Sequence, residues 1–313
     1  MIQFAVSPNV LWSLGGLYAI LMVASVWVKV LRWREPGKDR SELVQRIRSW
    51  WVIVCVFTVA MVMRRNVSVA FFAFVSFLAL KEYLSIVPTR RADRRVLFWA
   101  YLSIPVQYYW VAQAWYGMFI IFIPVYVFLL LPMRMVIIGE MKEFLRAAGT
   151  LHWGIMTLVF GVSHIAYLLV LPEAGNPKAG GAGLVLFLVF LTQFNDVAQY
   201  VWGKLLGRNK IIPKVSPNKT WEGFLGGVAT TTLLSVLISG WLTPMSWAVA
   251  AGAGLLISIA GFIGDVTISA LKRDIGLKDS GSMLPGHGGI LDRIDSLTYT
   301  APLFFHFIYY LYY

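Results

Sequence analysis

The sequence has little charge and almost no cysteine. Only 13% of its 313 residues are Asp, Glu, Lys or Arg, and 58% are hydrophobic. A soluble domain has roughly a quarter charged residues, so this composition excludes a large soluble protein and indicates a polytopic membrane protein. The single cysteine, Cys55, excludes an intrachain disulfide and any cysteine-based metal site. A basic segment before the first apolar run is also missing, because the first lysine is Lys29. We therefore expect a retained first span and not a cleaved signal peptide.

Long apolar stretches predict an all-α fold, a polytopic integral membrane helical bundle with about nine to ten transmembrane helices. We expect residues 1–313 to form one integral membrane domain. A full crossing of the membrane takes about 20 residues, so the ends of the short stretch at 50–63 stay open. The region 96–133 could form two helices or one re-entrant pair. The stretches are 10–30, 50–63, 67–87, 96–112, 116–133, 151–171, 183–203, 223–242, 246–267 and 297–313.

The basic residues are concentrated between these stretches. The net charge of +12 is therefore better explained by the excess of Lys and Arg in cytoplasmic loops than by nucleic-acid binding, and no nucleic-acid partner is expected. With about ten spans, the basic segments 29–48, 90–95, 134–146, 204–219 and 272–293 all fall on one side of the membrane. This pattern predicts both termini outside and these loops in the cytoplasm. Arg64-Arg65 is the one discordant pair.

The longest polar run in the second half extends from Ser269 to Asp295. Its Pro285–Gly289 core cannot continue a helix, because proline fixes φ and glycine favours turns. The run is rich in carboxylates and cations, a mixture that suits divalent metal and phosphate chemistry. Asp292 and Asp295 would share a helical face, and with Asp265 they could hold Mg²⁺. The alternative is a set of ion pairs with Lys272, Arg273 and Arg293.

A second polar stretch runs from Lys204 to Gly227. Ser216 to Glu222 resembles a helix start, and lysines beside free backbone N–H groups make a phosphate site. The alternative is a basic cytoplasmic loop that ends in a helix cap. Asp196 lies inside an apolar stretch, where a buried carboxylate is costly, so it is a candidate functional residue. The alternative is a carboxylate near the membrane interface that pairs with Lys204 or with a neighbouring helix.

These residues resemble the signature of the phosphatidate cytidylyltransferase (CDP-diacylglycerol synthase) family. The matching positions are Ser269, Lys272-Arg273, Lys278-Asp279, His287-Gly288-Gly289 and Asp292-Arg293-Ile294-Asp295. The run Ser216–Gly223 is similar to a second family segment. Asp196 and Tyr200 match a third, in which Gln199 replaces the usual alanine. The resemblance covers residues 183–296 well and the first 150 residues poorly.

The resemblance implies transfer of a cytidylyl group from CTP to phosphatidate, giving CDP-diacylglycerol and pyrophosphate for phospholipid biosynthesis. It implies an Mg²⁺ cofactor held by Asp265, Asp292 and Asp295, and it leaves open whether a second metal ion binds. It also implies a homodimer in the cell (inner) membrane. We predict catalytic roles for Asp265, Lys272, Arg273, Asp292 and Asp295. We predict substrate contacts from Asp196, Lys210, Ser216, Lys219, Thr220, Glu222, Lys278, Asp279, His287 and Arg293.

Two other functions remain open at this point. A CTP-dependent lipid kinase would share the nucleotide and the membrane setting, but would release CDP and not pyrophosphate. A lipid-binding or transport protein could keep the polar loops without catalysis, although transporters place ionisable groups near mid-membrane and not at helix ends. The acyl-chain preference and the exact lipid phosphate are also open.

Overall fold

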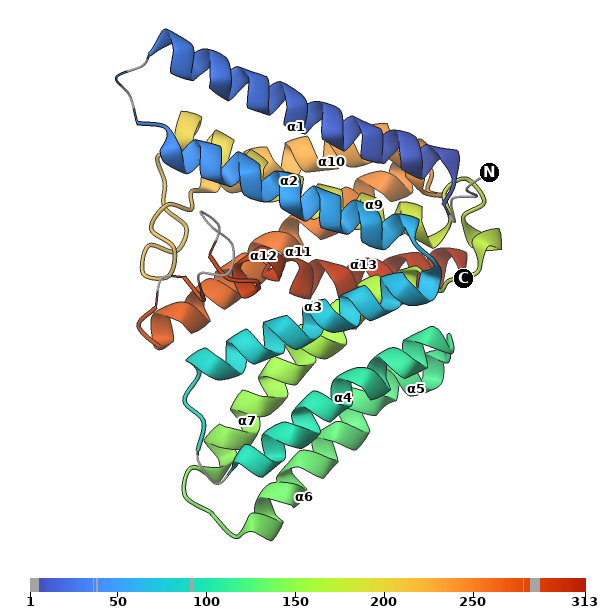
Figure 1. Cartoon of the computed structure of the whole chain (residues 1–313), viewed down its shortest axis with the longest axis vertical. Helices are drawn as coiled ribbons and strands as arrows, with labels where there is room; N and C mark the ends of the chain where they lie inside the picture. The colour runs from blue at the N-terminus through green and yellow to red at the C-terminus, as the bar shows by residue number, and fades with distance from the viewer. Residues whose placement is uncertain (1–5, 36, 38, 91–92, 278, 282–287) are drawn as a thin grey trace.

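The computed structural model is an all-α bundle (Figure 1). It describes the chain except residues 1–5, 36, 38, 91–92, 278 and 282–287. The elements are α1 (Pro8–Arg34), α2 (Ser41–Val62), α3 (Arg65–Ile86), α4 (Arg94–Ala112), α5 (Tyr116–Ile121), η2 (Phe122–Val127), α6 (Phe128–Ile138), α7 (Phe144–Ile155), η3 (Met156–Gly161), α8 (Val162–Leu168), η4 (Glu173–Gly175), α9 (Gly180–Leu206), α10 (Trp221–Leu242), α11 (Trp247–Asp274), α12 (Leu291–Ile294) and α13 (Leu297–Tyr312).

In the described part of the chain, eight helices are long and apolar enough to cross a membrane. This confirms the predicted polytopic, all-α fold. The short stretch at 50–63 is the second part of α2, which begins at Ser41. The region 96–133 holds α4 and then one continuous helical run, Tyr116–Ile138, formed by α5, η2 and α6. Two separate helices therefore replace the re-entrant alternative.

The two ends of the bundle differ. The N- and C-termini lie at one end, and the turns after α1, α3, α6, α9 and α11 lie at the other (Figure 1). The described residues of the predicted basic segments belong to this second end. Arg64 and Arg65 instead stand at the start of α3, in the turn on the side of the termini.

Aromatic packing fixes α13 against the middle of the chain. The ring of Phe305 lies 5.9 Å from that of Phe119 and 5.2 Å from that of Tyr167. His164 is fully buried among these rings, and its Nδ1 lies 2.7 Å from the carbonyl oxygen of Phe160. This histidine therefore serves helix packing.

Small residues let three helices approach closely at the basic end. A Cβ on Gly223 of α10 would lie only 2.7 Å from the carbonyl oxygen of Gln199 on α9. A Cβ on Gly264 of α11 would lie 2.7 Å from the carbonyl oxygen of Asp295. Both distances are below those that real Cβ atoms show, so glycine is required at each contact. These contacts bring the ends of α9, α10 and α11 next to the segment that follows α12.

Candidate active site

Three predicted carboxylates converge at the basic end of the bundle. Asp196 comes from α9, Asp265 from α11, and Asp295 directly follows α12. The Nζ of Lys219 lies 2.6 Å from Oδ2 of Asp265, and both side chains are about four-fifths buried, with 19% and 22% exposed. The hydroxyl of Ser296 donates to Asp196, with distances of 3.1 and 3.2 Å to the two oxygens. The two polar segments of the sequence therefore meet here.

Three carboxylates meet the cation of Lys219 at this point, so negative charge is in excess. Burial raises the pKa of Asp295 well above its usual range, and the charges of Asp265 and Asp196 raise it further. Burial lowers the pKa of Lys219, but attraction to Asp265 and Asp196 outweighs this effect, so the pKa is raised. Close carboxylates that oppose one another's ionisation favour binding of a cation. Their oxygens are also the ligand type that Mg²⁺ prefers, so the donor chemistry of these residues suits the ion.

A polar cavity of about 490 Å³ has two of these carboxylates, Asp196 and Asp265, in its wall. Thr220 at its wall caps α10, where its hydroxyl accepts the N–H of Gly223 at 3.1 Å. The cavity size falls in the range of about 300–1,000 Å³ that is typical of small-molecule sites. The predicted residues that line it are Asp196, Lys210, Ser216, Lys219, Thr220 and Asp265. Lysines gathered beside carboxylates suit a substrate that carries phosphates and a metal ion.

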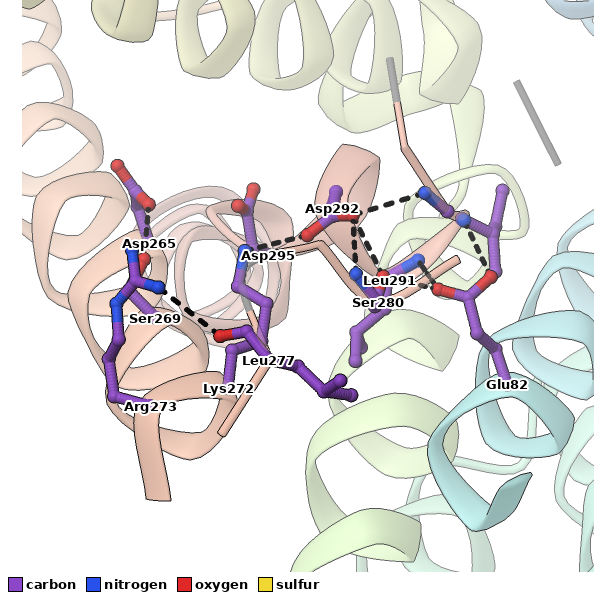
Figure 2. Close-up of polar contacts among 12 residues, drawn as sticks. Glu82, Asp265, Ser269, Lys272, Arg273, Leu277, Ser280, Leu291, Asp292 and Asp295 are labelled. Atoms are coloured by element: carbon purple, nitrogen blue, oxygen red, sulfur yellow. Dashed lines mark hydrogen bonds and ion pairs between the residues drawn. The ribbon is translucent and has the colours of Figure 1, made fainter. Parts of the chain in front are cut away.

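Asp292 lies in a different polar cluster (Figure 2). Its Oδ1 is 2.7 Å from the Nζ of Lys272, while its Oδ2 accepts the N–H of Ser280 at 3.0 Å and that of Gly289 at 3.1 Å. Burial raises the pKa of Asp292, but these hydrogen bonds, with that of Lys272 first, outweigh it and lower the pKa. Both oxygens of Asp292 are therefore engaged by protein donors.

The metal prediction can be compared with these two clusters. In the described residues, no group of three or more His, Cys, Asp and Glu side chains is placed to hold a metal ion. Asp265 and Asp295 share their environment with Asp196, whereas Asp292 is paired with Lys272. The set of Asp265, Asp292 and Asp295 stays a prediction.

Two predicted residues hold the loops in place. Glu222 accepts the N–H groups of Arg208 and Asn209 at 3.1 and 3.2 Å, and the side-chain amide of Asn209 at 2.7 Å. Arg273 donates to the carbonyl oxygens of Val215 and Leu277, each at 3.2 Å. Glu222 thus fastens the loop after α9, and Arg273 joins the two polar segments.

The remaining predicted residues lie nearby or outside the described chain. Asp279 is exposed, and Arg293 is half-buried with its backbone oxygen 3.4 Å from Nε2 of Gln193. Lys278 and His287 lie outside the described residues.

Glu82 of α3 is a residue that the predicted site did not include. Its carboxylate accepts the N–H of Ile290 at 2.8 Å, the N–H of Leu291 at 3.1 Å, and the hydroxyl of Ser280 (Figure 2). A Cβ at Gly289 would lie 1.9 Å from Oε1 of Glu82, so a larger residue there would displace this carboxylate. The available signal was an ionisable residue late in an apolar stretch. Its partners, more than 190 positions away, could not be read from the sequence.

Comparison with known proteins identifies a family and several relatives. The model of the Cytidylyltransferase family matches residues 44–311. The Escherichia coli (strain K12) protein "Uncharacterized protein YnbB" is 47% identical over 95% of this chain and 98% of its own length.

Several relatives carry the name phosphatidate cytidylyltransferase, among them proteins from Synechocystis and Brucella suis. The one from Synechocystis sp. (strain ATCC 27184 / PCC 6803 / Kazusa) is 47% identical over 36% of this chain and 39% of its own length. The one from Brucella suis biovar 1 (strain 1330) is 43% identical over 49% of this chain and 65% of its own length. Each match thus spans less than two thirds of the named enzyme.

The match to the family model covers most of the chain, including every element from α3 to α12. The predicted class of enzyme, a nucleotidyltransferase of membrane lipid metabolism, is confirmed at the level of the family. The chain belongs to the cytidylyltransferase family.

Proposed function

We propose that this protein is a phosphatidate cytidylyltransferase. It transfers the cytidylyl group of CTP to phosphatidate and releases pyrophosphate. The observation that carries the proposal is the meeting of Lys219 and Asp265 at 2.6 Å, beside a polar cavity and two further carboxylates. Family membership and relatives named for this activity support the choice of nucleotide and lipid.

The reaction needs both anionic substrates in one place. A phosphate oxygen of phosphatidate attacks the α-phosphorus of CTP, and the bond from that phosphorus to the β-phosphate bridge breaks. A phosphate monoester is already ionised near pH 7, so the attack needs no strong base. Positioning and charge neutralisation then supply most of the catalysis, as in other phosphoryl transfers.

Different residues bind the phosphates and the metal ion. Lys219, with Lys210 and Lys204 at the cavity wall, neutralises the phosphates of CTP. Asp265 and Asp295 would hold Mg²⁺ together with oxygens of the substrate phosphates, with Asp196 adding negative charge beside them. The ion would supply Lewis-acid stabilisation of the phosphate charges. Lys272 and Asp292 neutralise each other and orient the segment that carries Asp295.

The setting of the protein is part of the proposal. The end of the bundle that carries the basic segments faces the cytoplasm, where CTP is available, and the protein resides in the cell (inner) membrane. The site lies at the ends of membrane helices, which suits a lipid whose phosphate stands at the membrane surface. A homodimer is a further expectation from the family.

The test is product analysis. Detergent-purified protein is incubated with CTP, phosphatidate and Mg²⁺, and the products are identified by mass. We expect equal amounts of CDP-diacylglycerol and pyrophosphate, both lost on chelation. Asp265→Asn should lose the activity, while Asp274→Asn, an exposed aspartate at the end of the same helix, should keep it. Release of CDP would instead identify a lipid kinase, and absence of any nucleotidyl transfer would refute the proposal.

A further inference from the structure

A largely apolar groove of about 360 Å³ begins beside the polar site. Its walls come from α2, α3, α9 and the region of α12. Val56 of α2 and Phe74 of α3 line the groove and are 49% and 57% exposed on the outside of the bundle. Val189 of α9 lines it from the inner side and is half-buried. The groove is thus open sideways toward the membrane interior.

Polar groups occur at one end of the groove. Arg293 and Gln193 both line it, and Arg293 lies two residues before Asp295 of the carboxylate cluster. The Nε of Arg293 is buried and has no hydrogen-bond partner in the described structure. A buried donor without a partner is costly, so a ligand oxygen at this position would be stabilising. A cation at the mouth of an apolar groove matches a molecule with an anionic head and an apolar tail.

The N-terminal hairpin of α1 and α2 completes the apolar space. A second cavity of about 410 Å³ lies between α1, α9 and α10, and it shares Leu17, Leu186 and Phe190 with the groove. Reciprocal hydrogen bonds of 3.0 Å between Asn9 and Trp241 attach α1 to α10. The match to the family model begins at residue 44, so α1 is an addition to the matched region.

We propose that the groove holds an acyl chain of the lipid phosphate substrate, with its phosphate at Arg293 and the α1–α2 hairpin as one wall. This inference rests on the proposed function and adds the lipid subsite to it. The hairpin thereby gains a role in lipid selection that the motifs of the second half do not provide. Entry of the lipid between α2 and α3 requires no passage through water.

The experiment uses phosphatidate with a diazirine in one acyl chain. Illuminated wild-type protein in detergent is digested, and labelled peptides are identified by mass spectrometry. We expect label on groove residues of α2, α3 or α9, displaced by excess phosphatidate but not by diacylglycerol, which lacks the phosphate. Val56→Trp should reduce the label, whereas Val59→Trp, on the same helix but outside the groove and 59% exposed, should not. Val189→Trp provides a second obstruction, from α9.

Turnover gives an independent readout. Val56→Trp and Val189→Trp should raise KM for long-chain phosphatidate by about tenfold, with little change in kcat or in turnover of dihexanoyl phosphatidate. Groove labelling that phosphatidate displaces supports the inference even if the protein makes no CDP-diacylglycerol, in which case only the proposed reaction fails. Label outside the groove, or equal label in Val56→Trp and Val59→Trp, overturns the inference even if turnover is normal.

Discussion

Glu82 should be needed for full activity, although it lies far in the sequence from the predicted site residues. Its carboxylate accepts three hydrogen bonds, from Ser280, Ile290 and Leu291, and thereby ties α3 to the segment that carries Asp292 and Asp295. A hydrogen bond to a charged group contributes about 1.5–3 kcal/mol when buried. Glu82 is half-buried, so we estimate that Glu82→Ala weakens the order of this segment by about 2–4 kcal/mol.

If this order is needed in the transition state, kcat/KM for cytidylyl transfer should fall by about 30- to 1,000-fold in Glu82→Ala. Glu82→Gln keeps one acceptor oxygen and should lose about tenfold. Glu42→Ala is the control, because its pair with Arg46 is exposed and contributes little. Thermal unfolding of each purified variant establishes that the bundle is intact. A folded Glu82→Ala protein with kcat/KM within a factor of two of the wild type would refute this reasoning.

Three further substitutions test the two clusters. Lys219→Met removes a largely buried cation from the polar cavity and should raise KM for CTP at least about tenfold, while Lys214→Met, exposed in the same loop, should leave it unchanged. Asp265→Asn should lower Mg²⁺ affinity at least about tenfold in calorimetric titration, because a charged oxygen ligand is lost; an unchanged affinity would exclude Asp265 as a ligand. Lys272→Met leaves the carboxylate of Asp292 buried without its cation and should destabilise the fold by about 3–5 kcal/mol, observed as a lower Tm.

The helical face on which site residues lie could be predicted from their spacing in the sequence. Asp265, Ser269 and Lys272 are spaced i, i+4 and i+7, which predicts one helical face, and α11 places Ser269 Oγ 3.3 Å from Asp265. Spacing along a helix does not show which neighbouring element each side chain meets. Lys272 therefore turned out to pair with Asp292, while Asp265 pairs with Lys219 of the other polar stretch.

The first half of the chain was less predictable for a physical reason. Apolar spans have similar compositions, so the sequence shows that they cross a membrane but not which spans are neighbours. The contact of Glu82 with the segment before α12, and the apolar groove between α2 and α9, both depend on that arrangement. The helix ends shifted for a related reason: α2 begins nine residues before the apolar stretch because charged residues of its first turns extend beyond the apolar layer.

The charge balance at the site leads to a final prediction. Lys219 is the cation bound to Asp265, yet CTP requires positive charge at its phosphates. We expect a divalent cation at Asp265 and Asp295 to replace this ion pair and free Lys219 to contact a phosphate. CTP and Mg²⁺ should therefore increase each other's affinity by the same factor, because coupling between two ligands is reciprocal. Titration of CTP at several Mg²⁺ concentrations would measure this factor. In Lys219→Met the factor should decrease toward the value for Mg²⁺ and CTP in free solution, whereas an unchanged factor would show that Lys219 does not exchange partners.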